Sequence, residues 1–507
     1  KDAEGVYQNS AILTSTHSTL TGGGSITLGG ITAANANTPL FNAGAITKTG
    51  DGAFTFNAGT TGNWTELEYT IDLMAGTNIK ADDYEANLLG ALKNLGYKID
   101  SITTNVDGIL QIKVSSSGKN GFLNYANSAN TTVAANGLWQ ARFDNPDVNG
   151  TLTSIINAIR DTGSGAVGTT LTDTQATQAL ASYAGSSVTS LLASQRDDLR
   201  QQVKWIRNRT TQMGVKQSVV NEDMPYFNAW IQGNGGYNSI DQKGDQAGYT
   251  LDTWGGTLGF DVDLNDKLTI GAAFTANYNK LKTQSFDQAE GDNDAYYANI
   301  FARVQLKKWA HTLIVTGGWN DANLNRNVAI GNTAYKAHGT TTGSTYGAFY
   351  EATYDIALNE KQTSILQPLF NTSIYRSSMD DYTETGMGDA SMKVSDMEAT
   401  YGTVGLGARL MGIVGTNLFG RGSLGEVRAQ VVQDYGDKTN EARLCPMGSP
   451  LGVMNIKGAK VGTTGVQLGA GLTVPVGTNS SIYADADLDL RSNATVVSGN
   501  IGYRYNF

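Results

Sequence analysis

The chain ends on a stretch, residues 494–507, in which apolar and polar side chains alternate up to a terminal aromatic residue. Side chains two residues apart lie on the same face of a β-strand. One face of this stretch carries Val497, Ile501, Tyr503, Tyr505 and Phe507, and the other carries Ser498, Asn500, Gly502, Arg504 and Asn506. A soluble sheet seldom leaves so apolar a strand at a free edge, where it invites aggregation. A strand that closes a barrel in a membrane has no free edge, so the stretch predicts a membrane-embedded β-barrel.

The same alternation recurs upstream and predicts twelve strands in all. We expect them at residues 226–237, 253–264, 268–281, 294–306, 309–320, 342–358, 363–376, 398–413, 418–435, 463–476, 481–491 and 495–507. Tight turns at residues 265–266, 307–308, 359–360 and 477–479 alternate with long polar loops at 238–246, 282–293, 321–341, 377–397 and 436–462. Short turns on one side and long loops on the other are typical of outer-membrane barrels.

The predicted strands place apolar side chains on one face and acidic side chains on the other. We expect an acidic group inside the barrel, consisting of Asp261, Asp263, Glu351, Asp355, Asp485, Asp487 and Asp489. A polar interior under an apolar exterior is inverted relative to a soluble protein. The rival interpretation, a soluble sandwich, would bury the apolar faces against each other and is disfavoured.

A basic helix is predicted just before the barrel, at residues 186–214. Its apolar seam is narrow, and most of its circumference is polar, which is typical of a helix that is solvated or enclosed by polar walls. At about 1.5 Å per residue it would span about 40 Å, enough to cross a bilayer core. We expect it inside the barrel, where it would pair with the acidic group through Arg196, Arg200, Lys204, Arg207 and Arg209. A coiled coil is the alternative, but the seam covers too few heptads to favour it.

The chain divides into four predicted parts. Residues 1–62 carry short alternations between glycine turns and predict a β-solenoid remnant, with a glycine-rich hairpin as the alternative. Residues 63–150 predict a small β-α-β-β module whose helix lies near residues 81–95. Residues 151–220 form a helical linker that ends in the basic helix, and residues 221–507 form the barrel.

Composition excludes several classes of function. Net charge is −10 and there is no basic patch, so we expect no nucleic-acid partner. A single cysteine, Cys445 in the longest predicted loop, excludes an internal disulfide. We expect it to be exposed, as a free thiol or in a bridge to another chain, with a buried position as the alternative. The alternate aspartates Asp485, Asp487 and Asp489 spread along a strand, so wall charge is favoured over a metal site. The sequence lacks the common hydrolase and nucleotide-binding motifs, and we expect neither a cofactor nor enzymatic activity.

Several phrases of the sequence resemble those of classical autotransporters of the type V secretion route. They are ASYAGSSVTSLLASQRDDLR before the barrel, FNAWIQGNGGY in its first strand, LNDKLTIGAAFTANY at its first tight turn, LQPLFNTSIY and the closing GNIGYRYNF. The glycine, lysine and aromatic pattern of residues 44–56 is similar to the β-helix repeat of autotransporter passengers. The resemblance covers residues 172–507 well. Some family members cut the passenger between two asparagines of the pore helix, whereas this helix carries only Asn208.

The resemblance implies a mainly β fold: a 12-stranded antiparallel transmembrane β-barrel with a lumenal α-helix, preceded by a short β-solenoid remnant and a small α/β module. It implies translocation and display of the N-terminal passenger at the surface of a Gram-negative-type bacterium, with the barrel in the outer membrane. Its partners would be outer-membrane lipid, lipopolysaccharide, the barrel-assembly machinery and an unknown surface ligand. The machinery would recognise a C-terminal assembly signal that contains Tyr503, Tyr505 and Phe507. The chain begins at Lys1, and we expect it to come from an exported precursor whose signal peptide is removed.

Two other functions are compatible with the sequence. In the first, the barrel is a static outer-membrane anchor for an adhesive or assembly module in residues 1–150. In the second, it is a porin-like channel, with residues 186–214 outside an open lumen. Channel conductance separates the second from the leading interpretation.

Overall fold

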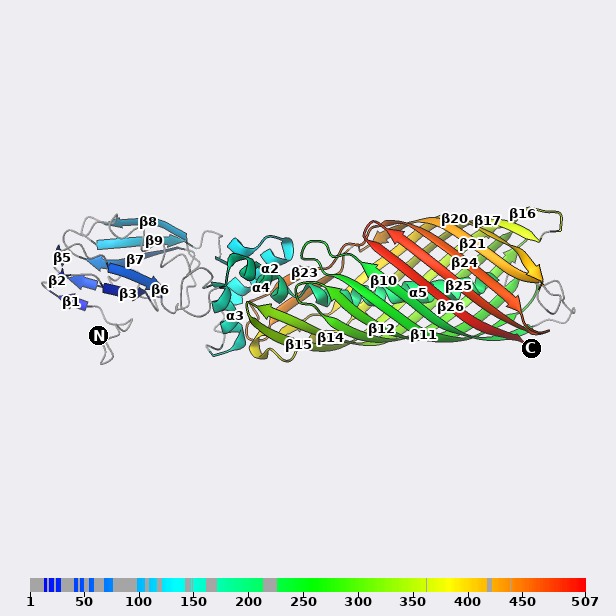
Figure 1. Cartoon of the computed structure of the whole chain (residues 1–507), viewed down its shortest axis with the longest axis horizontal. Coiled ribbons are helices and arrows are strands. Elements are labelled where there is room, and N and C mark those ends of the chain that lie inside the picture. The colour runs from blue at the N-terminus through cyan, green and yellow to red at the C-terminus, as the bar shows by residue number, and fades with distance from the viewer. Residues whose placement is uncertain are drawn as a thin grey trace.

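The computed structural model describes short strands within residues 13–115, followed by residues 121–141, 147, 149–160, 171–212, 226–361, 363–416, 422–437 and 439–507. Along the chain these form a group of short strands, a group of helices and a large barrel (Figure 1). The helices lie at one end of the barrel, and the carboxyl terminus lies at the other end.

The barrel is a closed antiparallel sheet of twelve long strands. They are β10 (Tyr226–Ile240), β11 (Gly248–Asp263), β12 (Leu268–Gln284), β13 (Glu290–Leu306), β14 (Trp309–Ile330), β15 (Thr333–Tyr354), β17 (Ser364–Met379), β20 (Met397–Thr416), β21 (Gly422–Gly436), β24 (Thr464–Pro475), β25 (Ser480–Arg491) and β26 (Ala494–Asn506). The short β16 (Ile356–Ala357) continues β15 at its end. Pairing of β10 with β26 closes the sheet, from Asn228 opposite Asn506 to Ile240 opposite Ala494. The predicted 12-stranded barrel is therefore confirmed.

The two faces of the strands have opposite chemistry. On β11, Trp254, Leu258 and Phe260 are exposed on the outside, whereas Thr257 and Asp261 are buried in the lumen. The other strands repeat this alternation, because side chains of a strand point to opposite faces in turn. The barrel is thus apolar where lipid would contact it and polar inside.

Aromatic side chains mark both borders of the apolar surface. At the tight-turn end, Trp309 packs against Tyr354, with 5.0 Å between ring centroids. Towards the long-loop end, Trp319 stacks on Tyr296 at 5.6 Å. The ten residue-to-residue steps from Trp309 to Trp319 cover about 33 Å of strand, or about 25 Å of height at a tilt of about 40°. That height equals the apolar band of outer-membrane barrels, which is about 25 Å tall.

The strands β14 and β15 continue well beyond this band. The sequence predicted a polar loop at residues 321–341, but the structure has a hairpin there that turns only between Ile330 and Thr333. The prediction is wrong because Leu324, Val328 and Ile330 are buried side chains of an extended strand that packs on helix α4 (Asp173–Ala184). The polar residues between these apolar ones made the sequence of this segment resemble a loop.

Two other predicted loops also contain regular structure. Segments of both form a four-stranded sheet, in the order β18 (Tyr382–Thr383), β19 (Met392–Val394), β22 (Glu441–Pro446) and β23 (Met454–Lys457). The short helix η5 (Gly388–Ala390) lies in the first of these loops. Cys445 lies in β22 and is partly buried, which corrects its predicted exposed position in a loop.

Helices α2 (Ala129–Ala141), α3 (Thr151–Arg160) and α4 pack with this sheet at the long-loop end. The short helix η3 (Gly121–Tyr125) precedes them. Their contact faces are fully buried, and the shared core contains Leu138, Leu152, Ile155, Ile159, Leu180, Met392, Val394, Leu444, Met454 and Ile456. We call these helices and the four-stranded sheet the surface cap.

The described N-terminal strands pair in two ways. They are β1 (Leu13–Ser15), β2 (Ser18–Thr21), β3 (Gly24–Leu28), β4 (Phe41–Ala43), β5 (Ile46–Thr49), β6 (Phe54–Ala58), β7 (Glu68–Ala75), β8 (Lys98–Thr104) and β9 (Ile109–Ser115). β4, β5 and β6 pair in parallel with β1, β2 and β3, as successive coils of a β-solenoid do. β7 pairs in parallel with β4 and antiparallel with β9, which pairs with β8. The helix predicted near residues 81–95 lies outside the described residues.

Candidate functional site

A single helix, α5 (Thr189–Gln212), runs inside the barrel lumen and is the candidate functional site. It follows α4 through a left-handed glycine, Gly185, and the short helix η4 (Ser186–Val188). It lies against strands on many sides of the barrel, namely β10 to β15, β17, β20 and β26. Its 24 residues span about 36 Å, which exceeds the roughly 30 Å of a bilayer core.

The helix buries polar side chains all around its circumference. Buried polar or charged residues of α5 include Ser194, Gln195, Arg196, Asp197, Asp198, Gln201, Gln202, Arg207, Asn208 and Arg209. Burying such groups is costly unless each finds a partner. The lumen wall supplies these partners along the helix.

Arg207 makes a buried ion pair between the helix and the barrel wall. Its Nε donates to Oε2 of Glu351 on β15 at 2.7 Å. Glu351 also accepts from Nη2 of Arg409 on β20 at 3.0 Å, so one carboxylate lies between two guanidinium groups. Removing that carboxylate would leave two buried positive charges without this partner.

Asn208 and Arg209, the next two residues of the helix, contact other parts of the wall. Arg209 Nη2 lies 3.2 Å from Asp261 Oδ1 on β11, and its guanidinium faces the rings of Trp230 and Tyr483. Asn208 Nδ2 donates to Asp487 Oδ2 at 2.8 Å. These contacts reach different strands, so the helix is held from more than one side.

The acidic residues of α5 also bond to the wall. Tyr249 of β11 donates its hydroxyl to Asp197. Asp198 accepts from Asn277 Nδ2 at 2.8 Å and from the Tyr297 hydroxyl at 2.6 Å. Two wall strands, β12 and β13, therefore share one helix carboxylate.

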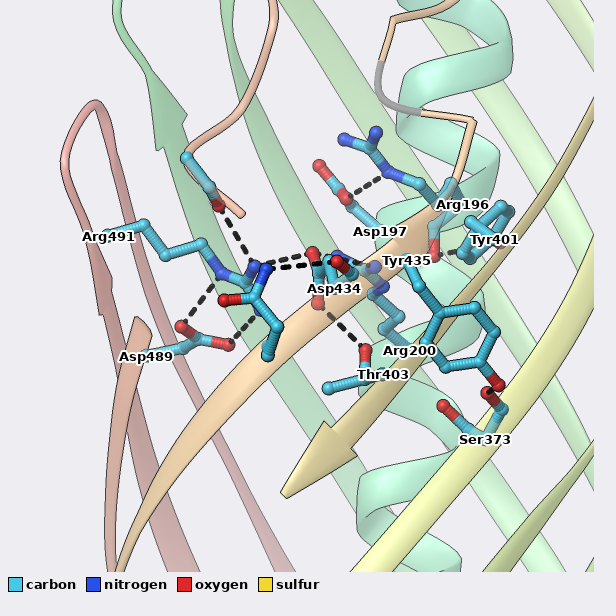
Figure 2. A network of polar contacts seen from close by, with 12 residues as sticks. Arg196, Asp197, Arg200, Ser373, Tyr401, Thr403, Asp434, Tyr435, Asp489 and Arg491 are labelled. Carbon is cyan, nitrogen blue, oxygen red and sulfur yellow. Dashed lines mark hydrogen bonds and ion pairs between the residues drawn. The ribbon is translucent and has the colours of Figure 1, made fainter. Parts of the chain in front are cut away.

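Figure 2 shows a polar network around Arg200 in which charges alternate in sign. Arg200 Nη2 lies 3.0 Å from Asp434 Oδ2 of β21. The same carboxylate binds Arg491, whose Nε lies 3.1 Å from Asp489 Oδ1. Thr403 donates to the other oxygen of Asp434 at 2.9 Å. The network joins the helix to β20, β21 and β25.

A small cavity of about 80 Å³ remains between α5 and the wall beside this network. Lys204, Arg200 and Arg207 line it from the helix, and Asp489 and Arg491 line it from the wall. Among the described residues no carboxylate lies within ion-pair distance of Lys204. Lys204 therefore borders this cavity and closes no salt bridge with a described carboxylate.

The predicted pairing of basic helix and acidic wall needs several corrections. Arg196 forms its ion pair with its neighbour Asp197, and its Nη2 donates to the Tyr249 hydroxyl of the wall at 3.4 Å. Asp263 accepts from Thr269, and Asp355 accepts from the amides of Gln305 and Gln367, so neither of these carboxylates contacts α5. The physical reason is position, because both lie near the tight-turn end of the barrel, where polar side chains of neighbouring strands bond to them.

Wall arginines, which the sequence reasoning missed, neutralise much of the acidic wall. Arg428 of β21 lies 3.3 Å from Asp485 and 2.9 Å from Asp487, and Arg491 binds Asp489. Arg409 contributes in the same way at Glu351. The alternation along the strand could have predicted these arginines, because Glu426, Arg428 and Gln430 lie two residues apart and so point into the lumen together.

The predicted assembly signal lies on the outer surface of β26. Tyr503 and Tyr505 are about two-fifths exposed and Phe507 is 71% exposed. The Phe507 amide donates to the carbonyl oxygen of Phe227 at 2.8 Å, which ties the last residue to the first barrel strand. Arg504 faces the lumen and donates to Asn228.

Two findings concern other kinds of site. No helix within the described part of the chain is long and apolar enough to cross a membrane. The described residues also contain no group of three or more histidine, cysteine, aspartate or glutamate side chains placed to hold a metal ion.

A model of the family described as "Autotransporter beta-domain" matches residues 229–487, which is just over half of the chain. The chain belongs to the autotransporter family. The autotransporter is also 24% identical over 282 residues to "Outer membrane protein B" of Rickettsia rickettsii, covering 52% of this chain. This chain spans only 16% of that relative's length. Together the family and the relative place the autotransporter in the outer membrane.

Solved structures with similar folds include two autotransporter barrels. The translocator domain of NalP from Neisseria meningitidis has a TM-score of 0.48 at 13% identity, covering 61% of this autotransporter and 98% of that chain. The β-domain of the Bordetella autotransporter Brka has a TM-score of 0.41 at 15% identity, covering 56% of this autotransporter and 100% of that chain.

Proposed function

We propose that this autotransporter exports its own N-terminal residues through the barrel, displays them at the cell surface, and keeps α5 in the lumen as a plug. Passenger translocation is the general function of the family. The observation that carries the plug proposal is that α5 bonds to the wall through Arg207, Asn208 and Arg209 while its polar side chains are buried. We infer no catalytic step for this function.

The direction of the chain supports display at the surface. The helix α5 enters the lumen from the surface cap, which lies at the long-loop end, whereas the tight turns and the carboxyl terminus lie at the opposite end (Figure 1). Outer-membrane barrels place long loops outside and tight turns in the periplasm. Residues before α5 would then lie outside the cell.

Surface exposure is tested by adding protease to intact cells. The proposal predicts that residues 1–120 are digested, whereas the barrel survives in the membrane. A periplasmic marker protein, probed in the same samples, must remain intact to show that the cells are sealed. Protection of residues 1–120 until the outer membrane is broken would contradict display.

The plug is tested by single-channel recording in planar bilayers. The intact chain should conduct poorly, and deletion of residues 189–212 should raise the conductance severalfold because it empties the lumen. Deletion of residues 1–115 is the matched control, because it removes more mass but keeps α5. An intact chain with a large open pore that is unchanged by deleting α5 would support the porin-like alternative.

A further inference from the structure

In the surface cap, the first turn of helix α3 is hydrogen-bonded to a loop of the barrel. The first backbone amides of a helix lack partners within the helix. In α3 the amide of Leu152 donates to Oδ1 of Asp389, which lies in the β17–β20 loop, at 3.0 Å. Gly150 makes this approach possible, because a β-carbon there would stand 2.1 Å from Asp389 Oδ2. The barrel therefore caps α3 from a residue more than two hundred positions away.

Helix α2 is held in a similar way by two other loops. The buried Asp245 of the β10–β11 loop accepts from the Thr131 amide at 3.1 Å and from the Ser128 hydroxyl. Asn130 bonds to both backbone groups of Lys457 on β23, at 2.8 and 2.9 Å. By contrast, α4 begins with a capping box of its own, made by Thr172 and Gln175.

A buried arginine of the barrel fixes the turn between α4 and α5. Arg326, on the extension of β14, donates to both oxygens of Glu384 at 2.7 and 2.8 Å and lies 3.2 Å from Asp287. Asp287 in turn accepts from the Ser187 hydroxyl. At Gly185 the backbone has a φ of 72°, and a β-carbon would stand 3.0 Å from Arg326 Nη1, so the turn fits closely around the guanidinium.

Arg326 places one buried positive charge between two buried carboxylates. The residue is 1% exposed, and its outward neighbours on β14 are polar, so it lies beyond the apolar band. Burial opposes the charge, but Glu384 and then Asp287 outweigh this effect and raise the pKa of Arg326 above its ordinary value. Loss of Arg326 would leave both carboxylates buried without their cation.

We propose that the surface loops of the barrel are a folding platform for the helices of the surface cap. The loops supply the acceptors for α2 and α3 and the apolar sheet that shares one buried core with all three helices, and the extension of β14 supplies the cation that fixes the α4–α5 turn. The segment would take its helical structure only when these loops are in place. The inference rests on the proposed export, because it describes what the segment meets when it leaves the lumen.

Hydrogen–deuterium exchange of the full chain, purified in detergent, tests the platform. Asp389→Ala should speed exchange of α3 amides by about 5- to 30-fold, the usual effect of losing a cap. Asp245→Ala should act in the same way on α2. In both variants α4, which caps itself, should change little.

The Arg326→Ala variant decides whether the helices depend on the barrel loops. It should speed exchange by about a hundredfold or more in α3 and α4, because it leaves buried charges unpaired, while the barrel strands stay protected.

The exposed loop residues Asp381 and Asp241 provide matched controls, as Asp381→Ala and Asp241→Ala, and should leave the helices unchanged. If the loops of the Arg326→Ala variant exchange freely but α3 and α4 keep full protection, the helices fold alone and the proposal is wrong. Because exchange is read on purified protein, that result would leave export itself, tested by surface protease, unaffected.

Discussion

At the scale of single residues, the carboxylate of Glu351 is buried in the lumen between two arginines. It is 1% exposed and bonds to Arg207 of the helix and Arg409 of the wall. Buried pairs contribute little net stability when intact, but breaking one by removing a partner costs about 3–5 kcal/mol. The site is therefore sensitive to loss of one group.

We predict that Glu351→Gln lowers the temperature at which the folded barrel unfolds. The expected loss is about 3 kcal/mol or more, because two buried guanidinium groups lose their charge partner. The measurement is a heat-modifiability gel, in which folded and unfolded barrels migrate differently over a series of temperatures. Asp355→Asn is the control, since Asp355 bonds only glutamine amides among its described partners and should lose about 1 kcal/mol or less. Equal shifts in the two variants would contradict the prediction.

At the scale of the element, neighbouring strands fit together through aromatic side chains packed over glycines. A β-carbon at Gly259 of β11 would stand 2.1 Å from the Trp230 ring of β10. Comparable contacts join Gly271 to Phe301 and Gly502 to Tyr483. In each case the glycine leaves room in the lumen wall for a ring that the adjacent strand carries.

We predict that Gly259→Val reduces the fraction of folded barrel and its thermal stability. The added side chain would displace the buried Trp230, and overpacking typically costs about 1–3 kcal/mol. The same gel measures both quantities. Gly233→Val is the matched control, because Gly233 lies on β10 with nothing within 4 Å of its β-carbon position. An effect of Gly233→Val as large as that of Gly259→Val would point to strand propensity and not to packing.

The elements differ in how far the sequence predicts them. Period-two alternation predicted all twelve barrel strands, because one face meets lipid and the other a polar lumen where each strand crosses the apolar band. It did not predict which charges meet, since pairs such as Arg209 with Asp261 depend on helix rotation and strand register. The four-stranded sheet of the surface cap was missed because β18, β19 and β23 are two to four residues long, too short to show a period. The caps that Asp245 and Asp389 provide are long-range and leave no local signal.

At the scale of the whole molecule, the barrel sheet keeps two free edges until its first and last strands pair. β10 pairs with β26 over its length, and the last residue bonds to Phe227. The outer face at this end of the barrel presents Tyr503, Tyr505 and Phe507, which the sequence analysis predicts to be the signal read during assembly.

We predict that deletion of Phe507 reduces assembly into the membrane more than it reduces the stability of barrels already assembled. The side chain is 71% exposed and packs only beside Tyr505 among its ring contacts, so its loss removes little buried area. Assembly is measured as the fraction of chain that becomes heat-modifiable in cells, and stability as the unfolding temperature of purified barrel. Ile300→Ala is the control, because Ile300 is 70% exposed on the same outer surface and should leave assembly unchanged. A drop in unfolding temperature without a drop in assembly would contradict a role as a signal.

The charged lumen has a further consequence for an emptied barrel. The wall carries more carboxylates than guanidinium groups: Asp261, Asp263, Glu351, Asp355, Glu426, Asp434, Asp485, Asp487 and Asp489 against Arg303, Arg409, Arg428, Arg491 and Arg504. The helix α5 brings five basic residues and two acidic ones, so it offsets part of this excess. The electric field within a narrow low-dielectric channel favours ions whose sign is opposite to that of the charges lining the channel. A barrel without α5 would therefore select cations over anions, and a salt gradient across it would give a reversal potential of the corresponding sign.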